Sequence, residues 1–181
     1  MKSGTIAGTY NENISIVSTG ATSINVICSG TSTNPPAPVI YAPTVTSLSG
    51  FNYGYGNGPS GTQCFNISAQ YLIDTLFLSC TPEFEISAAG SNVFFSGNNC
   101  IKLLPTEGMI NTTIYTRLRS GLNVNTYSNE KIILSSTGAV SQTVLLSGSV
   151  TSIPVISPQP QSITICAGSN ARFFSKASSP Q

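Results

Sequence analysis

A repeated hairpin pattern is the feature that most constrains what this chain can fold into. Residues 2–31 return between residues 119 and 150 with the same turn and strand residues in the same order. The matches are Ser3-Gly4 with Ser120-Gly121, Thr9-Tyr10 with Thr126-Tyr127 and, after a one-residue insertion, Ser18-Thr19-Gly20 with Ser136-Thr137-Gly138 and Ser29-Gly30 with Ser147-Gly148. In both copies, alternating apolar residues flank a turn that contains glycine, which supplies the positive φ of a tight connection. We therefore predict that each copy forms a β-hairpin that closes a β domain.

Proline-rich segments follow both copies, at residues 34–38 and at Ser152-Ile153-Pro154. Proline cannot extend a sheet and stiffens a junction, so these segments predict domain boundaries. We expect residues 1–33 to be the C-terminal hairpin of a preceding repeat, 34–150 a complete β-sandwich repeat, and 151–181 the first strands of a following Ig-like domain. A lone hairpin is marginal in water. The expectation is therefore that the chain is part of a longer protein, in which the first hairpin could also pair with a neighbouring chain.

Short alternating runs separated by turn residues recur through the complete repeat. We expect strands at 39–45, 50–53, 62–69, 75–80, 84–87, 100–104, 112–119, 130–135 and 143–149. This spacing is typical of a β-sandwich. The predicted fold class is all-β, an Ig-like antiparallel β-sandwich with one complete domain flanked by fragments of its neighbours. The predicted core residues are Phe65, Ile67, Leu76, Leu78, Phe84, Ile86, Tyr115, Leu118, Ile132, Leu134, Val144 and Leu146.

The composition supports a β-rich chain and excludes two classes of partner. Charged residues make up 7% of the sequence, against about a quarter in ordinary soluble domains. Helix formers such as Glu, Lys and Arg are therefore scarce. The basic residues are spread singly and form no stripe that could neutralise phosphates, so we expect no nucleic-acid partner. No apolar run is long enough to span a bilayer as a helix, so we expect no membrane insertion.

Six short elements, in this order, resemble a domain that is repeated in large cell-surface and secreted proteins of the Bacteroidetes. They are Gly58-Pro59-Ser60, residues 63–69, Pro82-Glu83-Phe84-Glu85-Ile86-Ser87, Tyr115-Thr116-Arg117-Leu118-Arg119, Thr126-Tyr127 and Leu146-Ser147-Gly148. The last thirty residues, with Pro154-Val155-Ile156 and Thr164-Ile165-Cys166-Ala167-Gly168, resemble the opening of a second, Ig-like type of domain from the same proteins. The resemblance implies an exported multidomain adhesin or surface protein, carried by the type IX secretion route.

The residues available for chemistry favour a protein that is not an enzyme. The sequence has no histidine, which removes the commonest general base and metal ligand. Glu83 and Glu85 resemble a carboxylate pair, but polar residues alternating around Phe84 and Ile86 are what a half-buried strand requires. No acidic loop of the kind that binds calcium is present. We predict no catalytic residue, no cofactor and no metal.

A glycine-rich aromatic segment, residues 50–58, is the candidate ligand-contact loop. Phe51, Tyr53 and Tyr55 could stack on a sugar or a peptide if the loop exposes them. The alternative, which we favour, is a wide turn with Phe51 and Tyr53 packed into the edge of the sandwich. Tryptophan, the strongest platform for sugars, is absent from the chain.

The five cysteines include no Cys-x-x-Cys pair, which argues against zinc and thioredoxin-type sites. Cys28 aligns with Leu146, so we predict a thiol in a core position. Cys64, Cys80 and Cys100 fall in the complete repeat, and an exported domain permits a disulfide. If one forms, we prefer Cys80 with Cys100, because both lie at strand ends.

These observations predict a non-catalytic structural or adhesive repeat of a large exported protein, located outside the cell or at its surface. It would act as a stalk or spacer, with neighbouring domains of the same chain as its partners. The alternative is a module that binds a glycan or a protein and is appended to a secreted hydrolase. Exposure of the aromatic segment separates the two hypotheses, since packed aromatic side chains favour the spacer.

Overall fold

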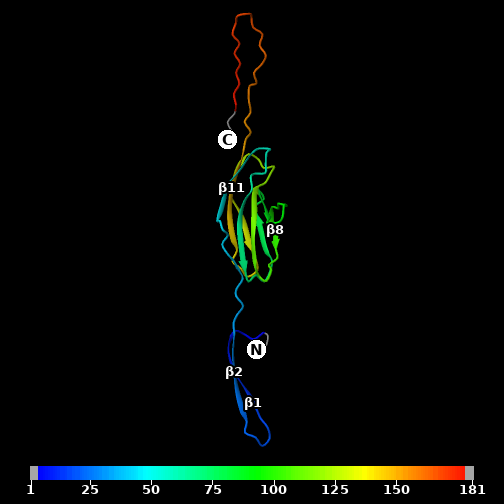
Figure 1. Ribbon diagram of the computed structural model, residues 1–181. Coiled ribbons are helices and arrows are strands. Elements are labelled where there is room, and N and C mark those ends of the chain that lie inside the picture. Colours follow the sequence, from blue (N-terminus) through cyan, green and yellow to red (C-terminus); the bar gives the residue numbers. More distant parts are fainter. Residues whose placement is uncertain (1–3, 178–181) are drawn as a thin grey trace. The chain divides into compact units, whose positions relative to one another are not determined.

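The computed structural model describes residues 4–177, without the side chains of Asn99 and Cys100, and this part of the chain contains strands and no helix. The chain divides into two compact units, residues 1–37 and 38–181. The fold is all-β, as predicted from the low content of helix formers and the alternating apolar runs (Figure 1).

The first unit is an antiparallel hairpin of β1 (Gly8–Ile16) and β2 (Ile24–Ser32). Its register runs from Gly8 opposite Ser32 to Ile16 opposite Ile24. The connecting turn is closed by the amide of Ala21, which donates to the carbonyl of Ser18 at 3.2 Å. Gly20 in this turn has φ 80°, a conformation that glycine adopts without steric strain.

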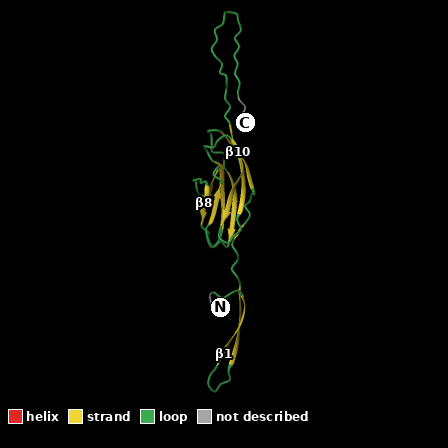
Figure 2. Ribbon diagram, turned by 180° about the vertical axis from the view of Figure 1, so that it is seen from behind, coloured by secondary structure: helices red, strands yellow, loops and turns green. Residues whose placement is uncertain are grey.

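The second unit is a β-sandwich of two sheets (Figure 2). One sheet has five strands in the order β4 (Ser47–Gly54), β11 (Gln142–Thr151), β10 (Asn125–Ser135), β6 (Leu76–Cys80) and β8 (Gly97–Leu103). The other has four in the order β3 (Val39–Ile40), β5 (Gln63–Gln70), β9 (Ile110–Leu118) and β7 (Phe84–Ala88). Each predicted strand of the repeat is present, but the one expected at 39–45 is shortened to Val39–Ile40. The β-sandwich is thus confirmed, and its assignment as Ig-like stays a prediction. The expectation of purely antiparallel pairing is corrected in one place, because β4 pairs with β11 in parallel.

The two sheets enclose one apolar core, in which side chains from both inner faces interdigitate. Every predicted core residue is buried except Tyr115, which is 38% exposed. That prediction is wrong because residues alternate between the two faces of a strand. On β9, Ile114 and Leu118 face the core, so Tyr115 points to the outer surface, where it lies opposite Cys64.

The hairpin β10–β11 within the sandwich repeats the architecture of β1–β2. Its turn has the same closing bond, from the amide of Ala139 to the carbonyl of Ser136 at 3.2 Å, and Gly138 has φ 78°. The strands of the two hairpins also pair in the same register. In the first hairpin, the opposing pairs are Tyr10 with Gly30, Glu12 with Cys28 and Ile14 with Val26. The equivalent pairs in the second hairpin are Tyr127 with Gly148, Glu130 with Leu146 and Ile132 with Val144.

A β-bulge accounts for the single insertion between the two copies. The register of β10 shifts between Tyr127 and Glu130, where two residues occupy the place that Asn11 fills alone in β1. Asn129, inside the bulge, has φ 64°, a left-handed conformation that asparagine tolerates better than most residues. The insertion therefore changes the local twist of one strand and leaves the pairing on both sides intact.

A tyrosine fixes the chain that leads into each hairpin. The hydroxyl of Tyr10 donates to the carbonyl of Ile6 at 2.5 Å, and that of Tyr127 donates to the carbonyl of Asn123 at 2.8 Å. Desolvation by burial is the largest of the effects that raise the pKa of the Tyr127 phenol above its ordinary value of 10.0. The hydroxyl therefore stays protonated near neutral pH and remains a hydrogen-bond donor.

Residues 153–177, which follow the sandwich, are exposed and carry little regular structure. Their ordered features include a bridge between Ile156 and Ala177, a hydrogen bond from the amide of Ser157 to the carbonyl of Lys176 at 2.8 Å, and a turn from Cys166 to Ser169. The prediction that they open a following Ig-like domain stays a prediction.

Candidate functional site

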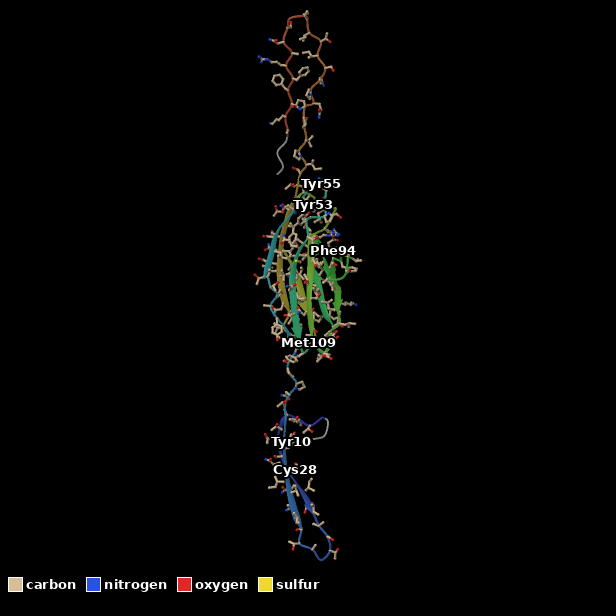
Figure 3. All side chains as sticks on the ribbon, viewed as in Figure 1. Tyr10, Cys28, Tyr53, Tyr55, Phe94 and Met109 are labelled. Carbon is tan, nitrogen blue, oxygen red and sulfur yellow. The ribbon has the colours of Figure 1, made fainter. Side chains whose placement is uncertain are left out.

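The first five residues of the aromatic segment predicted as a ligand-contact loop belong to β4, and Phe51 and Tyr53 are its buried side chains. Figure 3 labels Tyr53 and Tyr55 at one end of the sandwich. Phe51 is 1% exposed and packs edge-on against Phe84, with 5.2 Å between the ring centroids. Such an edge-to-face pair is favourable because the positive edge of one ring meets the negative face of the other. Phe51 thus connects β4 to β7 of the facing sheet and is not available at the surface.

Tyr53 is also buried, and its hydroxyl ties β4 to the segment after β9. The hydroxyl donates to the carbonyl of Arg119 at 2.7 Å and accepts from the amide of Leu122 at 3.3 Å. Its ring lies so close to Gly58 that a Cβ at that position would be 2.7 Å from it. The side chain of Tyr53 is therefore packed, as the packed interpretation predicted, and the ligand-contact role of the segment stays a prediction.

Tyr55 is the exposed aromatic residue of the three, with half of its surface accessible. Its backbone is fixed, because its amide donates to the carbonyl of Thr151 at the end of β11, at 2.8 Å. The ring stands at the end of the sandwich where β4 and β11 both end. A single ring of this kind can stack on a sugar or a peptide, but a groove needs a second wall.

An ion pair on the outer face of the four-stranded sheet was not foreseen from the sequence. Arg117 Nε donates to Glu85 Oε1 at 2.5 Å, and the guanidinium lies over the ring of Phe94, 3.8 Å from its centroid. Glu85 and Arg117 are directly opposite in the pairing of β7 with β9. The carboxylate of Glu85 is therefore held by the guanidinium of Arg117.

The cysteines are spread over different environments. Cys28, Cys64 and Cys166 are exposed. The exposure of Cys28 corrects the prediction of a core thiol, because no described residue covers the face of the hairpin on which it lies. Cys80 is buried, with its Sγ 3.3 Å from the carbonyl oxygen of Phe84. The side chain of Cys100 lies outside the described residues, so a disulfide between Cys80 and Cys100 stays a prediction.

A shallow cavity of about 300 Å³ lies on the five-stranded sheet beside Cys80. Ser79, Thr81, Asn98 and Lys131 supply its polar lining, and Pro82 and Ile133 part of its apolar lining. Among the described lining residues, the ionisable groups are the thiol of Cys80 and the amine of Lys131. Among residues 4–177, apart from the side chains not described, no three His, Cys, Asp or Glu residues are grouped as a metal site would require.

Comparisons with known proteins leave the family open. No protein family matches the sequence, and no curated protein is similar to it. The solved structures that the chain is similar to include the CooA pilin subunit from enterotoxigenic Escherichia coli, with 10% identity and a TM-score of 0.37, over 64% of this chain and 99% of the pilin chain. The described residues form no helix that is long and apolar enough to cross a membrane.

Proposed function

We propose that this chain is a non-catalytic structural repeat of a larger exported surface protein, in which it acts as a stalk or spacer. The observation that carries the proposal is the parallel pairing of β4 with β11. Ser47, the first residue of β4, lies opposite Leu145, the fourth residue of β11, and Gly54 lies opposite Thr151 at the ends of both strands. The chain therefore enters β4 at one end of the sandwich and leaves β11 at the other, which suits units joined in series.

The path before β4 supports the same entry point. The side chain of Gln142, the first residue of β11, donates to the carbonyl of Ile40 at 3.2 Å. The amide of Leu145 donates to the carbonyl of Thr46 at 2.9 Å, and Tyr55 closes the opposite end of the ladder. Tension applied along the chain would pull β4 and β11 past each other. The hydrogen bonds between them would then share the load rather than break one at a time.

The chemistry of the unit supports a role without catalysis. Histidine is absent from the sequence, and Glu85, one of its six acidic residues, is paired with Arg117. The resemblance of six short motifs to repeated domains of exported Bacteroidetes proteins supports the proposal of an extracellular location. The repetition of the hairpin supports neighbouring domains of the same chain as the first partners.

Single-molecule force measurement tests this proposal. We expect the sandwich, pulled from the two ends of the chain, to unfold in one step at a higher force than when it is pulled from handles at Ser47 and Leu145. Those two residues lie at the same end of the parallel pair, so the second geometry unzips the strands. Equal forces in the two geometries, or a lower force from the chain ends, would rule out a mechanical role for this pairing.

A second candidate function is recognition of a glycan or a protein, favoured by the exposed and anchored ring of Tyr55. Binding to a glycan array is the measurement, with Tyr55→Ala as the test variant. Tyr41→Ala is the control, since Tyr41 is also exposed, at 42%, but lies before β4. For a spacer we expect no specific binding by the folded chain. Binding that Tyr55→Ala abolishes and Tyr41→Ala retains would make the end of β4 a recognition site.

A further inference from the structure

The hairpin β1–β2 carries an apolar face that is exposed here and whose counterpart in the same chain is buried. We call the residues of this face the hairpin face; they are Ile14, Ile16, Val26 and Cys28. Paired residues of antiparallel strands project from the same side, and all four are exposed, Ile14 by 56%. Their counterparts in β10–β11 are at most 2% exposed; these are Ile132, Leu134, Val144 and Leu146.

The second unit shows what covers a face of this kind. There the four counterparts belong to one core together with residues of the facing sheet, which include Phe65, Phe84 and Ile114. Both outer edges of the hairpin β10–β11 are also paired with neighbouring strands. β11 pairs in parallel with β4, and β10 pairs antiparallel with β6.

A glycine marks the place where the neighbouring strand crosses. A Cβ at Gly148 would lie 2.3 Å from the carbonyl oxygen of Phe51, so β4 can approach β11 closely only if this residue has no side chain. Gly30 occupies the same register position in β2, opposite Tyr10 as Gly148 is opposite Tyr127. The hairpin β1–β2 therefore has a residue without a side chain, Gly30, at the position where a strand equivalent to β4 would have to approach closely.

The connection that leads into the hairpin is repeated as well. Gly4 has φ 83° and its counterpart Gly121 has φ 77°. The tyrosine bonds to Ile6 and to Asn123 fix both connections in the same way. In the second unit this connection follows β9, which places the hairpin directly after the strands that it covers.

We propose that the hairpin face binds strands of the type found in residues 38–118, supplied by a repeat that precedes it on the same chain. A β4-type strand pairs in parallel with β2 and crosses at Gly30, and a β6-type strand pairs antiparallel with β1. The proposal rests on the proposed role as one repeat in a series. The force measurement reads the unfolding of the sandwich, which is a separate unit from the hairpin, so its outcome does not depend on what the hairpin face binds.

The test is a longer chain in which a copy of residues 38–118 precedes Lys2 of the full sequence. Cys28 is the reporter, because it is exposed now and its counterpart Leu146 is 2% exposed. We expect alkylation of Cys28, assigned by peptide mass spectrometry, to slow by about a hundredfold in the longer chain. Amide hydrogen exchange of residues 8–32 should slow by a similar factor, because a covered segment must open before it can react. Gly30→Ala in the longer chain should restore reactivity, while Ser29→Ala, on the opposite face, should not.

A second longer chain shows whether the added strands can fold. In this control chain, a copy of residues 119–150 replaces residues 2–33. The added strands are then followed by the β10–β11 hairpin sequence, which covers the same strands in the second unit. If this control folds while Cys28 in the first chain reacts at its original rate, the proposal is overturned. Protection of Cys28 in the original chain that increases with protein concentration would also overturn it, because the face would then be covered by a second copy.

Discussion

Replacing Ile132 by alanine is expected to lower the free energy of unfolding of the sandwich by about 2–5 kcal/mol. Ile132 is fully buried on β10, the middle strand of the five-stranded sheet, between Val144 of β11 and Cys80 of β6. Removal of its side-chain methyl and methylene groups leaves a cavity between two packed sheets. Strands paired on both sides have little freedom to close such a cavity, which places the expected loss in the upper half of the range.

The matched control is Ile14→Ala, the same substitution at the equivalent position of the first hairpin. Ile14 is 56% exposed in this chain, so its truncation should change the stability of the sandwich by less than about 0.5 kcal/mol. Urea denaturation followed by fluorescence or circular dichroism measures both variants against the original chain. Equal losses for the two variants would show that burial does not separate the two hairpins in solution.

Replacing Gly148 by alanine is the second substitution with a large expected effect. The added Cβ would lie 2.3 Å from the carbonyl oxygen of Phe51 and 2.9 Å from its Cβ. A backbone carbonyl in a paired strand cannot move aside as the end of a flexible side chain can. We expect a loss of about 3 kcal/mol, the upper end of the usual range for overpacking, with β4 separated from β11.

Gly61→Ala is the control, because a Cβ at Gly61 meets nothing within 4 Å. Chemical denaturation gives the loss of stability, and hydrogen exchange of residues 47–54 shows whether it is concentrated in β4. If Gly148→Ala is as stable as Gly61→Ala, the parallel pairing of β4 with β11 is not as close as described.

The strands and most of the core could be predicted because they depend on local alternation. The repeated hairpin was predictable from residues 2–31 and 119–150, since glycine and alternating aliphatic residues recur there at matching positions. Tyr115 was misplaced because a single aromatic residue does not reveal which of the two faces of a strand is the inner one. Its pairing with Cys64 decides that question, and pairing is not visible in the sequence of one strand.

The candidate site was less predictable, since it depends on contacts between distant segments. The burial of Phe51 requires Phe84, and that of Tyr53 requires the carbonyl of Arg119. The Glu85–Arg117 pair follows from the register of β7 on β9. A carboxylate and a guanidinium at outward positions of two strands can indicate an ion pair, but only when the two strands are known to be neighbours in the sheet.

The strand order has a consequence for the time at which the unit can fold. β11 comes last along the sequence of the sandwich, yet it lies between β4 and β10 in the five-stranded sheet. A chain that emerges N-terminus first, from a ribosome or from an export channel, therefore holds β4 without its partner until residues 142–151 have appeared. The five-stranded sheet of the second unit can therefore be completed only after its last strand along the sequence has appeared.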